Sequence, residues 1–297
     1  MKKPTKAVIA AAGFGTRFLP QTKAMPKEMM PIIDKPIIQI VVEELVASGI
    51  KDIIIVGSSN KRAIEDHFDV PNEDLLSNLR AGGAKKAPLI DMLGEIAEMA
   101  NFIYVRQKGP YGNATPVLCA AHLIGPDEPF VYTYADEFFV ATPSRTQQMI
   151  TTYQEYGGSV YAASRITKNE EYDRYGIVGG ENVDTNTIKV DKIVEKPGKD
   201  KAPSNLASVS GYLLDPAILP YLDKAAKEHD GTGEFMIQPI MQKMMEDGHN
   251  VYAREITDGK YYDTGNQLEY VKTVIDFALR HDDLGSEVRK YIEERLQ

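Results

Sequence analysis

The segment K-A-V-I-A-A-A-G-F-G-T-R, Lys6–Arg17, decides the fold of this chain. Its first half, Lys6–Ala11, is a short apolar run, and Gly13 and Gly15 follow it closely. A short apolar run bounded by glycines is typical of a buried parallel strand that leads into a loop. We therefore expect the chain to begin with a central strand of an α/β sheet.

The residues beyond this segment complete a β-α-β unit. Pro36–Gly49 has the apolar spacing of a helix and ends at a glycine, and Asp52–Val56 is a second apolar strand. The alternation continues, with strands expected at Phe102–Val105 and Pro129–Tyr134 and helices at Lys61–Phe68 and Asn113–Leu123. This order predicts an α/β fold with a doubly wound, mainly parallel, Rossmann-like sheet, from which Asp74–Ala100 departs as a helical excursion.

The pattern changes after Thr142, where short strand-like pieces are separated by turn-rich segments. These pieces predict a smaller β-rich lobe with strands at Ser159–Ala163, Gly176–Gly179, Ile188–Val194 and Ala207–Leu214. C-terminal helices are expected to pack back on the core or to form a subunit contact, and the helical segments are Gly233–Met245, Asn266–Arg280 and Ser286–Leu296. We divide the chain accordingly into residues 1–142, 143–262 and 263–297.

The composition excludes several classes of function. The 297 residues include 43 acidic and 34 basic side chains, so the overall field repels a nucleic-acid backbone. Cys119 is the only cysteine, which excludes an internal disulfide and fits a reducing, cytoplasmic compartment. No apolar stretch reaches about 18 residues, and Met1–Ala12 is interpreted as a strand instead of a leader segment. We therefore expect a protein that binds neither nucleic acid nor a membrane.

The most informative segment is A-A-G-F-G-T-R-F-L-P-Q-T-K-A-M-P-K-E-M-M-P, Ala11–Pro31, which directly follows the first expected strand. Gly13 and Gly15 remove side chains where a backbone must approach a phosphate, and the N–H groups of such a loop bind anions. Three cations follow the glycines: Arg17, Lys23 and Lys27. A triphosphate needs this neutralisation, because attack on its α-phosphorus builds charge on the non-bridging oxygens and on the departing pyrophosphate.

Two common phosphate-binding motifs do not match this segment. Phe18 stands where a dinucleotide-binding fingerprint has its third glycine, and the G-K-[ST] ending of a P-loop is missing. A bare G-x-G is more often a surface loop with scattered charges. The length of the segment favours a functional loop of another kind.

The string G-x-G-T-R-x-L-P-x-T-K-x-x-P-K-E-M-x-P resembles the signature of bacterial UTP–glucose-1-phosphate uridylyltransferases, within the sugar-phosphate nucleotidylyltransferase family. The resemblance implies a nucleotidyltransferase fold that binds the nucleotide on residues 1–142 and the sugar phosphate on residues 143–262. It continues in order through D-K-P-I-I-Q (Asp34–Gln39), V-R-Q (Val105–Gln107), V-L-C-A (Val117–Ala120), Y-G-I-V (Tyr175–Val178), V-E-K-P (Val194–Pro197), A-P-S-N-L-A (Ala202–Ala207) and D-T-G-N (Asp263–Asn266).

The resemblance also implies roles for individual residues. Arg17 and Lys27 would stabilise the triphosphate and its transition state, and Lys23 would contact a phosphate. Because the sugar phosphate oxygen attacks the α-phosphorus directly, this chemistry needs positioning and charge neutralisation and no protein nucleophile. The residues expected to bind the nucleotide are Ala11, Ala12, Gly13, Gly15, Thr16, Glu28, Gln107 and Gly112.

Two aspartates are candidate metal ligands. Asp136 follows P-F-V-Y-T-Y at the carboxyl end of an expected central strand, where ligands of open α/β sheets bind. Asp263 lies between a short strand and a helix, where an isolated aspartate is more often an N-cap. The resemblance implies that the two together bind Mg²⁺, which prefers a few carboxylates with phosphates and water. Glu137 departs from the family's usual apolar or amide residue, and it either shifts the choice of metal or faces solvent.

The segment V-E-K-P contains the expected sugar-phosphate contacts. The carboxylate of Glu195 can accept hydrogen bonds from sugar hydroxyls, and the ammonium of Lys196 can pair with the phosphate. An isolated E-K-P would instead be an exposed ion pair at a strand end. The resemblance further implies that Gly176 lies near the hexose and that Asn205 also belongs to the sugar site.

Gln107 is the expected base-recognition residue, because its amide offers a donor and an acceptor to a pyrimidine edge. The turn after it departs from the family pattern at Ala114–Pro116. A second departure is G-E-F-M-I-Q-P, Gly233–Pro239, where these enzymes typically have G-D-E-I-Q-L. The choice between UTP and dTTP and the identity of the hexose therefore stay open.

The expected reaction joins UTP to glucose 1-phosphate and gives UDP-glucose and pyrophosphate, in a homo-oligomer that is a dimer or a tetramer. A thymidylyltransferase, or a uridylyltransferase for another hexose 1-phosphate, is the alternative within the same class. A nucleotide-sugar-binding protein without turnover is disfavoured because the charged residues of the site are all present. A nicotinamide-dependent oxidoreductase is disfavoured by the missing third glycine.

Overall fold

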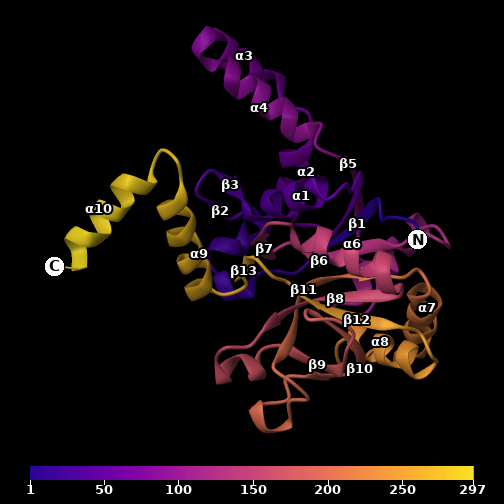
Figure 1. Ribbon diagram of the computed structural model, residues 1–297. Helices are drawn as coiled ribbons and strands as arrows, with labels where there is room; N and C mark the ends of the chain where they lie inside the picture. The colour runs from indigo at the N-terminus through magenta and orange to yellow at the C-terminus, as the bar shows by residue number, and fades with distance from the viewer. Residues whose placement is uncertain (297) are drawn as a thin grey trace.

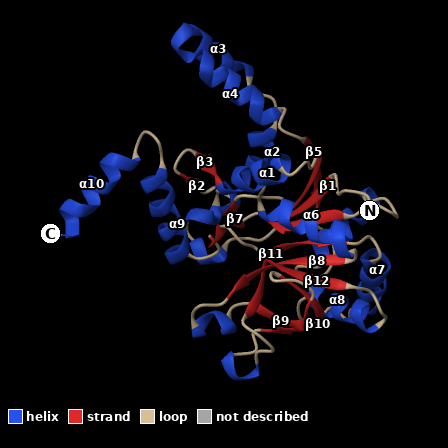
Figure 2. Cartoon of the chain, in the orientation of Figure 1, coloured by secondary structure: helices blue, strands red, loops and turns tan. Residues whose placement is uncertain are grey.

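The structure, a computed structural model, describes residues 1–296 and is built on one nine-stranded sheet with the order β5-β4-β1-β6-β11-β8-β12-β10-β9. Helices surround the strands on both sides (Figure 2). Within residues 1–296, no helix is long and apolar enough to cross a membrane. This architecture confirms the predicted α/β class.

The first half of the sheet is parallel. Its hydrogen-bonded pairs are β5–β4, β4–β1 and β1–β6, so three neighbouring strands end at the same edge as β1. The apolar run read from the sequence therefore forms a central strand, which is buried because β4 and β6 pair with its two edges and helices cover both of its faces. The bounds are β1 (Lys6–Ala11), β4 (Asp52–Gly57), β5 (Asn101–Arg106) and β6 (Phe130–Tyr134).

Successive side chains of β1 enter two different cores. Ala7 and Ile9 pack with α1 and α6 on one face of the sheet, whereas Val8 packs with α5, α7 and α8 on the other. This alternation is the period-2 pattern of a strand, and it explains the doubly wound arrangement. The helices are α1 (Ile37–Ala47), α2 (Arg62–Phe68), α5 (Thr115–Ala120), α6 (Arg145–Tyr156), α7 (Ile218–Glu228) and α8 (Ile237–Glu246).

The second half of the sheet is mostly antiparallel and corresponds to the predicted β-rich lobe. β11 pairs antiparallel with β6, β8 and β9, so it joins the two halves into one sheet. Because no break in the sheet separates the lobes, the division at residues 142 and 262 stays a prediction. The bounds are β8 (Ser159–Arg165), β9 (Gly176–Asn182), β10 (Thr187–Glu195), β11 (Leu206–Leu214) and β12 (Val251–Glu255).

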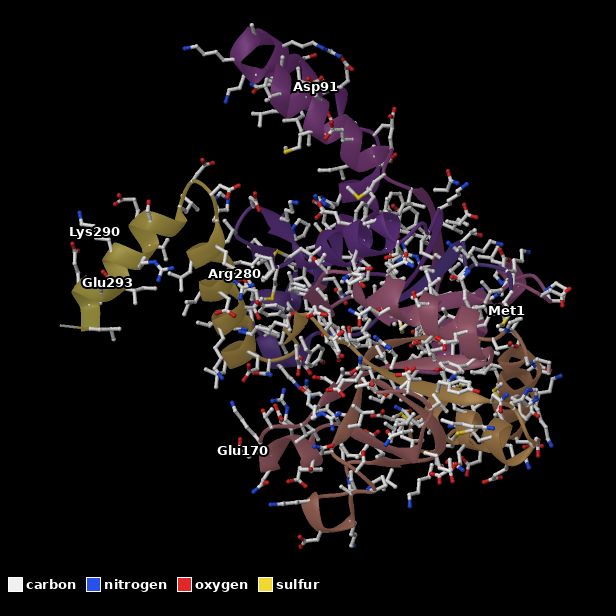
Figure 3. All side chains as sticks on the ribbon, viewed as in Figure 1. Met1, Asp91, Glu170, Arg280, Lys290 and Glu293 are labelled. Carbon is white, nitrogen blue, oxygen red and sulfur yellow. The ribbon has the colours of Figure 1, made fainter. Side chains whose placement is uncertain are left out.

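The predicted helical excursion projects from the body as a helical pair, α3 (Glu73–Ala81) and α4 (Ala87–Ala97). Figure 1 shows this pair standing clear of the sheet, and Figure 3 shows Asp91 on it, far from the rest of the molecule. The C-terminal helices are α9 (Gln267–Arg280), beside the body, and α10 (Gly285–Leu296), which extends away from it (Figure 1).

Several predicted elements need correction. The helix expected over Gly233–Met245 begins only at Ile237, because Phe235 bonds through its backbone to the turn at Tyr111 and Ala114. The helix expected over Asn113–Leu123 begins at Thr115 and ends in a 3-10 turn. Elements that were not predicted include α6, α7, β12 and the strand β7 (Glu137–Ala141).

Candidate active site

The glycine segment forms a loop at the carboxyl end of β1. Gly15 has a φ of 65°, a left-handed conformation that favours glycine, and it leads into a 3-10 turn over Thr16–Phe18. Thr22 Oγ1 donates to the carbonyl of Gly15 at 2.7 Å, so the loop is folded back on the residues that follow it. A fixed loop of this kind presents its backbone to a ligand without losing conformational entropy on binding.

A buried ion pair between Lys61 and Glu28 supports the glycine loop. The ammonium of Lys61 lies 2.8 Å from the carboxylate of Glu28 and donates to the carbonyl of Gly13 at 2.6 Å. Glu28 has no exposed surface, so its expected contact with the nucleotide stays a prediction. Lys61 was not predicted as a site residue, because a lysine at the start of a helix is usually solvated.

Lys27 is directed into the site by a second ion pair. Its ammonium lies 2.6 Å from Asp136 Oδ2, and both side chains are largely buried. Burial favours the neutral amine, but Asp136 and Glu28 raise the pKa of Lys27 to about 12. Lys27 is therefore a cation at any physiological pH. Lys23, in contrast, is exposed and lines neither of the two cavities described below.

Asp136 and Asp263 are brought together by a two-stranded ribbon. β7 pairs antiparallel with β13 (Gly259–Asp263), and the register sets Asp263 directly opposite Glu137. Thr264 then donates to the carbonyl of Asp136 from its N–H at 3.0 Å and from its Oγ1 at 2.7 Å. The two aspartates, distant in sequence, thus belong to one site.

The charged groups converge on a single point beside Gly265. A Cβ placed there would lie 3.0 Å from Asp263 Oδ1, 3.4 Å from Asp136 Oδ2 and 3.6 Å from Arg17 Nη1. Arg17 Nη1 also donates to the carbonyl of Gly265 at 3.2 Å. A side chain at this position would enter the space between the two carboxylates and the guanidinium, so glycine keeps that space open.

The side chain of Glu137 is half-buried and is held by two hydrogen bonds. Its Oε2 accepts hydrogen bonds from the Ser210 N–H at 3.0 Å and from the Tyr261 hydroxyl at 2.8 Å. Burial, with the neighbouring charges of Asp263 and Asp136, raises the pKa of Glu137 to about 7. Glu137 is therefore a third carboxyl group at the edge of the site, and its effect on the choice of metal stays a prediction.

The raised pKa of Glu137 predicts a stability that falls with pH. The folded state binds the proton of Glu137 more tightly than the unfolded state does, where the pKa has its ordinary value of 4.5. The stabilisation that comes from this proton is complete below pH 4.5 and is lost as the pH rises through about 7. In EDTA at pH 8 we expect Glu137→Gln to raise the free energy of unfolding by about 1–3 kcal/mol, with almost no change at pH 4.5. Urea unfolding at both pH values measures this, and an equal difference at the two would contradict it.

Two adjoining cavities surround these groups. The larger, of 920 Å³, is lined by Arg17, Lys27, both aspartates and Lys196. The smaller, of 380 Å³, is lined by residues of β9, β10 and β11. The two cavities adjoin each other, because five residues line both of them: Arg17, Tyr134, Glu137, Arg174 and Tyr175.

The smaller cavity contains two of the expected sugar-site residues. Glu195 is paired with Gly176 in the β9–β10 ladder, and a Cβ at Gly176 would lie 3.0 Å from Glu195 Oε2. Lys196 lines the larger cavity, 3.8 Å from the same glutamate. Asn205 lines neither cavity; it is exposed, and its Oδ1 accepts a hydrogen bond from Arg165 at 2.9 Å.

Gln107, the expected base-recognition residue, lies just beyond β5, the edge strand of the sheet, and lines neither cavity. The Gln107 N–H donates to the carbonyl of Gly57 at 2.9 Å, just beyond the end of β5. Gly112 has a φ of 149°, and a Cβ there would lie 2.1 Å from the carbonyl oxygen of Phe235. Backbone packing therefore explains this glycine, and its contact with a nucleotide stays a prediction, as does that of Gln107.

Comparison with known proteins settles the family. A family model described as Nucleotidyl transferase matches residues 6–278. This chain belongs to the nucleotidyl transferase family. The match spans the glycine loop, both aspartates and both cavities, so the whole site lies within the part of the chain that the family shares.

Relatives of this nucleotidyl transferase match it over nearly its full length. The UTP–glucose-1-phosphate uridylyltransferase of Bacillus subtilis (strain 168) is 40% identical, covering 100% of this chain and 98% of the relative. A protein of the same name from Staphylococcus epidermidis is 39% identical, covering 99% of each. These values confirm the resemblance that the motifs indicated.

Two solved structures share the fold. A UDP-glucose pyrophosphorylase complexed with UDP-glucose superposes with a TM-score of 0.81 at 34% identity, covering 94% of this chain and 100% of that one. A UTP-bound enzyme of the same kind from Acinetobacter baumannii has a TM-score of 0.85 at 32% identity, covering 98% and 99%. The predicted nucleotidyltransferase fold is thereby confirmed.

Proposed function

We propose that this nucleotidyl transferase transfers a uridylyl group from UTP to glucose 1-phosphate, forming UDP-glucose and releasing pyrophosphate. The relatives and the solved structures named above support this reaction. The single most informative feature of the site is the point beside Gly265, where Arg17 and the two aspartates converge. The cations of this site can neutralise anionic substrates, and its carboxylates can bind a metal ion. The site therefore suits a reaction between two anions.

We assign Mg²⁺ to Asp136 and Asp263. Within residues 1–296, no group of three or more His, Cys, Asp or Glu side chains is arranged to hold a metal ion. Two carboxylates nevertheless fit Mg²⁺, because it is usually bound by one or two carboxylates together with substrate phosphates and water. When bound, the ion would supply positive charge to phosphate oxygens of both substrates.

The side chains of the loop stabilise the charge that develops during transfer. Lys27, which is paired with Asp136, and Arg17, which lies beside Gly265, neutralise the triphosphate as the pyrophosphate departs. Lys196 pairs with the phosphate of the sugar, and Glu195 accepts hydrogen bonds from its hydroxyls. The phosphate oxygen of the sugar then attacks the α-phosphorus in line with the leaving group.

A substrate panel tests this proposal and its alternative. Pyrophosphate release is measured for UTP, dTTP, CTP and ATP, each with glucose 1-phosphate and with galactose 1-phosphate, in Mg²⁺. We expect UTP with glucose 1-phosphate to have the highest kcat/KM. A preference for dTTP would replace the proposal by thymidylyl transfer, and a preference for galactose 1-phosphate would change the sugar. Binding of UDP-glucose without release of pyrophosphate from any pair would contradict an enzymatic function.

Glu195→Gln tests the assignment of the sugar cavity. We expect KM for glucose 1-phosphate to rise by about tenfold and KM for UTP to change by less than about twofold, because the carboxylate contacts hydroxyls and not phosphate. Glu181→Gln, at an exposed position of β9, is the matched control. Initial rates with each substrate varied in turn give both constants. Equal increases in both KM values would mean that Glu195 does not belong to the sugar site.

The homo-oligomeric state and the cytoplasmic location expected from the sequence stay predictions. So does a subunit contact through the C-terminal helices, of which α10 extends away from the body (Figure 1).

A further inference from the structure

Asp263 already forms an ion pair with a cationic side chain of the protein. Arg174 Nη2 lies 2.6 Å from Asp263 Oδ2, and the hydroxyl of Tyr175 donates to the same oxygen at 3.3 Å. Arg174 lies just before β9, far from Asp263 in sequence, so the fold and not the local chain brings them together. A carboxylate that we assign to a metal thus has an internal competitor for that metal.

Arg174 also occupies a particular place between the cavities. Of the cationic side chains in residues 1–296, Arg17 and Arg174 are the two that line both cavities. Both side chains are exposed, but Arg17 donates to the carbonyl of Gly265, whereas Arg174, 38% exposed, is held by the carboxylate of Asp263. Arg174 therefore lies within reach of the position where the sugar site meets the metal site.

A metal ion and the guanidinium compete for Asp263. Two cations that share one carboxylate repel each other, so a divalent ion on Asp263 weakens the hold on Arg174. Within the described residues, Asp263 is the one carboxylate that accepts a hydrogen bond from this guanidinium. Once displaced, the planar fork of Arg174 needs a new anionic partner, and a phosphate matches its geometry.

We propose that Arg174 binds the phosphate of the sugar 1-phosphate, and that it is held on Asp263 until a divalent metal displaces it. This inference rests on the proposed function, since it assumes the metal and the sugar phosphate. Asp263 would then exchange one cation for another during each cycle, and Arg174 would be available for substrate only when the metal is present. Metal and sugar phosphate would consequently favour each other's binding.

The variant Arg174→Gln tests this proposal, because it should change two binding affinities in opposite directions. Without the competing cation, Mn²⁺ alone should bind the substrate-free protein about five- to tenfold more tightly than it binds the wild type. The same variant should bind glucose 1-phosphate in the presence of Mn²⁺ about tenfold more weakly, because the phosphate loses a charged partner. The two affinities therefore change in opposite directions, which the loss of a merely structural arginine would not produce.

The measurement uses the full chain. Free Mn²⁺ is titrated by electron paramagnetic resonance, glucose 1-phosphate binding by calorimetry, and the melting temperature verifies that the variant is folded. Lys272→Gln is the matched control: Lys272 also lines the larger cavity, but it pairs with Glu269 and does not contact Asp263. It removes the same charge, so we expect its Mn²⁺ affinity to rise by less than about twofold.

The outcomes separate the parts of the proposal. Unchanged or weaker Mn²⁺ binding in Arg174→Gln overturns the competition at Asp263, and so does an equal gain in Lys272→Gln. Tighter Mn²⁺ binding with unchanged glucose 1-phosphate binding overturns the phosphate contact. Failure of the wild type to form UDP-glucose would refute the proposed function instead, and the Mn²⁺ titration does not depend on turnover.

Discussion

Asp136→Asn and Asp263→Asn are each expected to lower kcat by about a thousandfold, the largest effect of any single change in this protein. Both substrates are anions, and their reacting atoms must approach within about 3–3.5 Å. Each substitution removes one of the two carboxylates that converge beside Gly265 and so removes half of the protein's contribution to the metal site. The activity that remains should require a higher Mg²⁺ concentration.

The double variant provides the sharper result. If one ion depends on both carboxylates, the first substitution already removes most of its effect, so Asp136→Asn with Asp263→Asn should be hardly worse than either alone. Asp283→Asn, in an exposed loop outside both cavities, is the control for the loss of an aspartate. Kinetics as a function of Mg²⁺ concentration are measured for the wild type and for all four variants. If the kcat losses of the two single variants multiply in the double variant, Asp263 has only a structural role. The same conclusion follows if Asp263→Asn requires no more Mg²⁺ than the wild type.

Lys27→Ala and Arg17→Ala should each lower kcat by about a hundredfold or more, because each removes a charge that is needed more in the transition state than in the ground state. Both cations are held in place by the protein: Lys27 by Asp136 at 2.6 Å, and Arg17 by the carbonyl of Gly265 at 3.2 Å. A fixed cation stabilises developing charge without having to reorganise, which is the reason for the size of the effect.

Lys23→Ala is the natural comparison for these two variants. Lys23 belongs to the same segment, but its side chain is exposed and lines neither cavity, so its removal should cost less than about tenfold. Circular dichroism and melting temperatures verify that all three variants are folded. Near-normal kcat in Lys27→Ala or Arg17→Ala, with UTP affinity intact, would refute their assigned roles.

The sequence predicted the parts of the fold whose signals are local. β1, α1 and β4 were predicted to within a few residues, because their apolar spacing matches one structural period and a glycine marks where the helix ends. α6 was missed because its segment R-T-Q-Q-M-I-T-T-Y-Q-E-Y is polar overall. Its burial depends instead on a distant partner, since Arg145 is fully buried against Glu44 at 2.7 Å.

The residues of the candidate site also fall into two groups, those that sequence motifs predicted and those that only the fold reveals. Arg17, Lys27, Asp136 and Asp263 belong to motifs that the resemblance identified, and the structure brings them together. Lys61 and Arg174 were missed because their roles come from contacts with residues distant in sequence, which no spacing along the chain reveals. The position of Arg174 directly before the Y-G-I-V segment was the one available signal.

The central claim is that a uridylyl group passes intact from UTP to the phosphate of glucose 1-phosphate. The most direct test incubates the protein with Mg²⁺, glucose 1-phosphate and UTP labelled with ³²P either on the α-phosphate or on the γ-phosphate. We predict that the α-label appears in UDP-glucose and that the γ-label appears in pyrophosphate, in equal amounts. Release of the γ-label as inorganic phosphate, or the absence of label from UDP-glucose, would contradict the account.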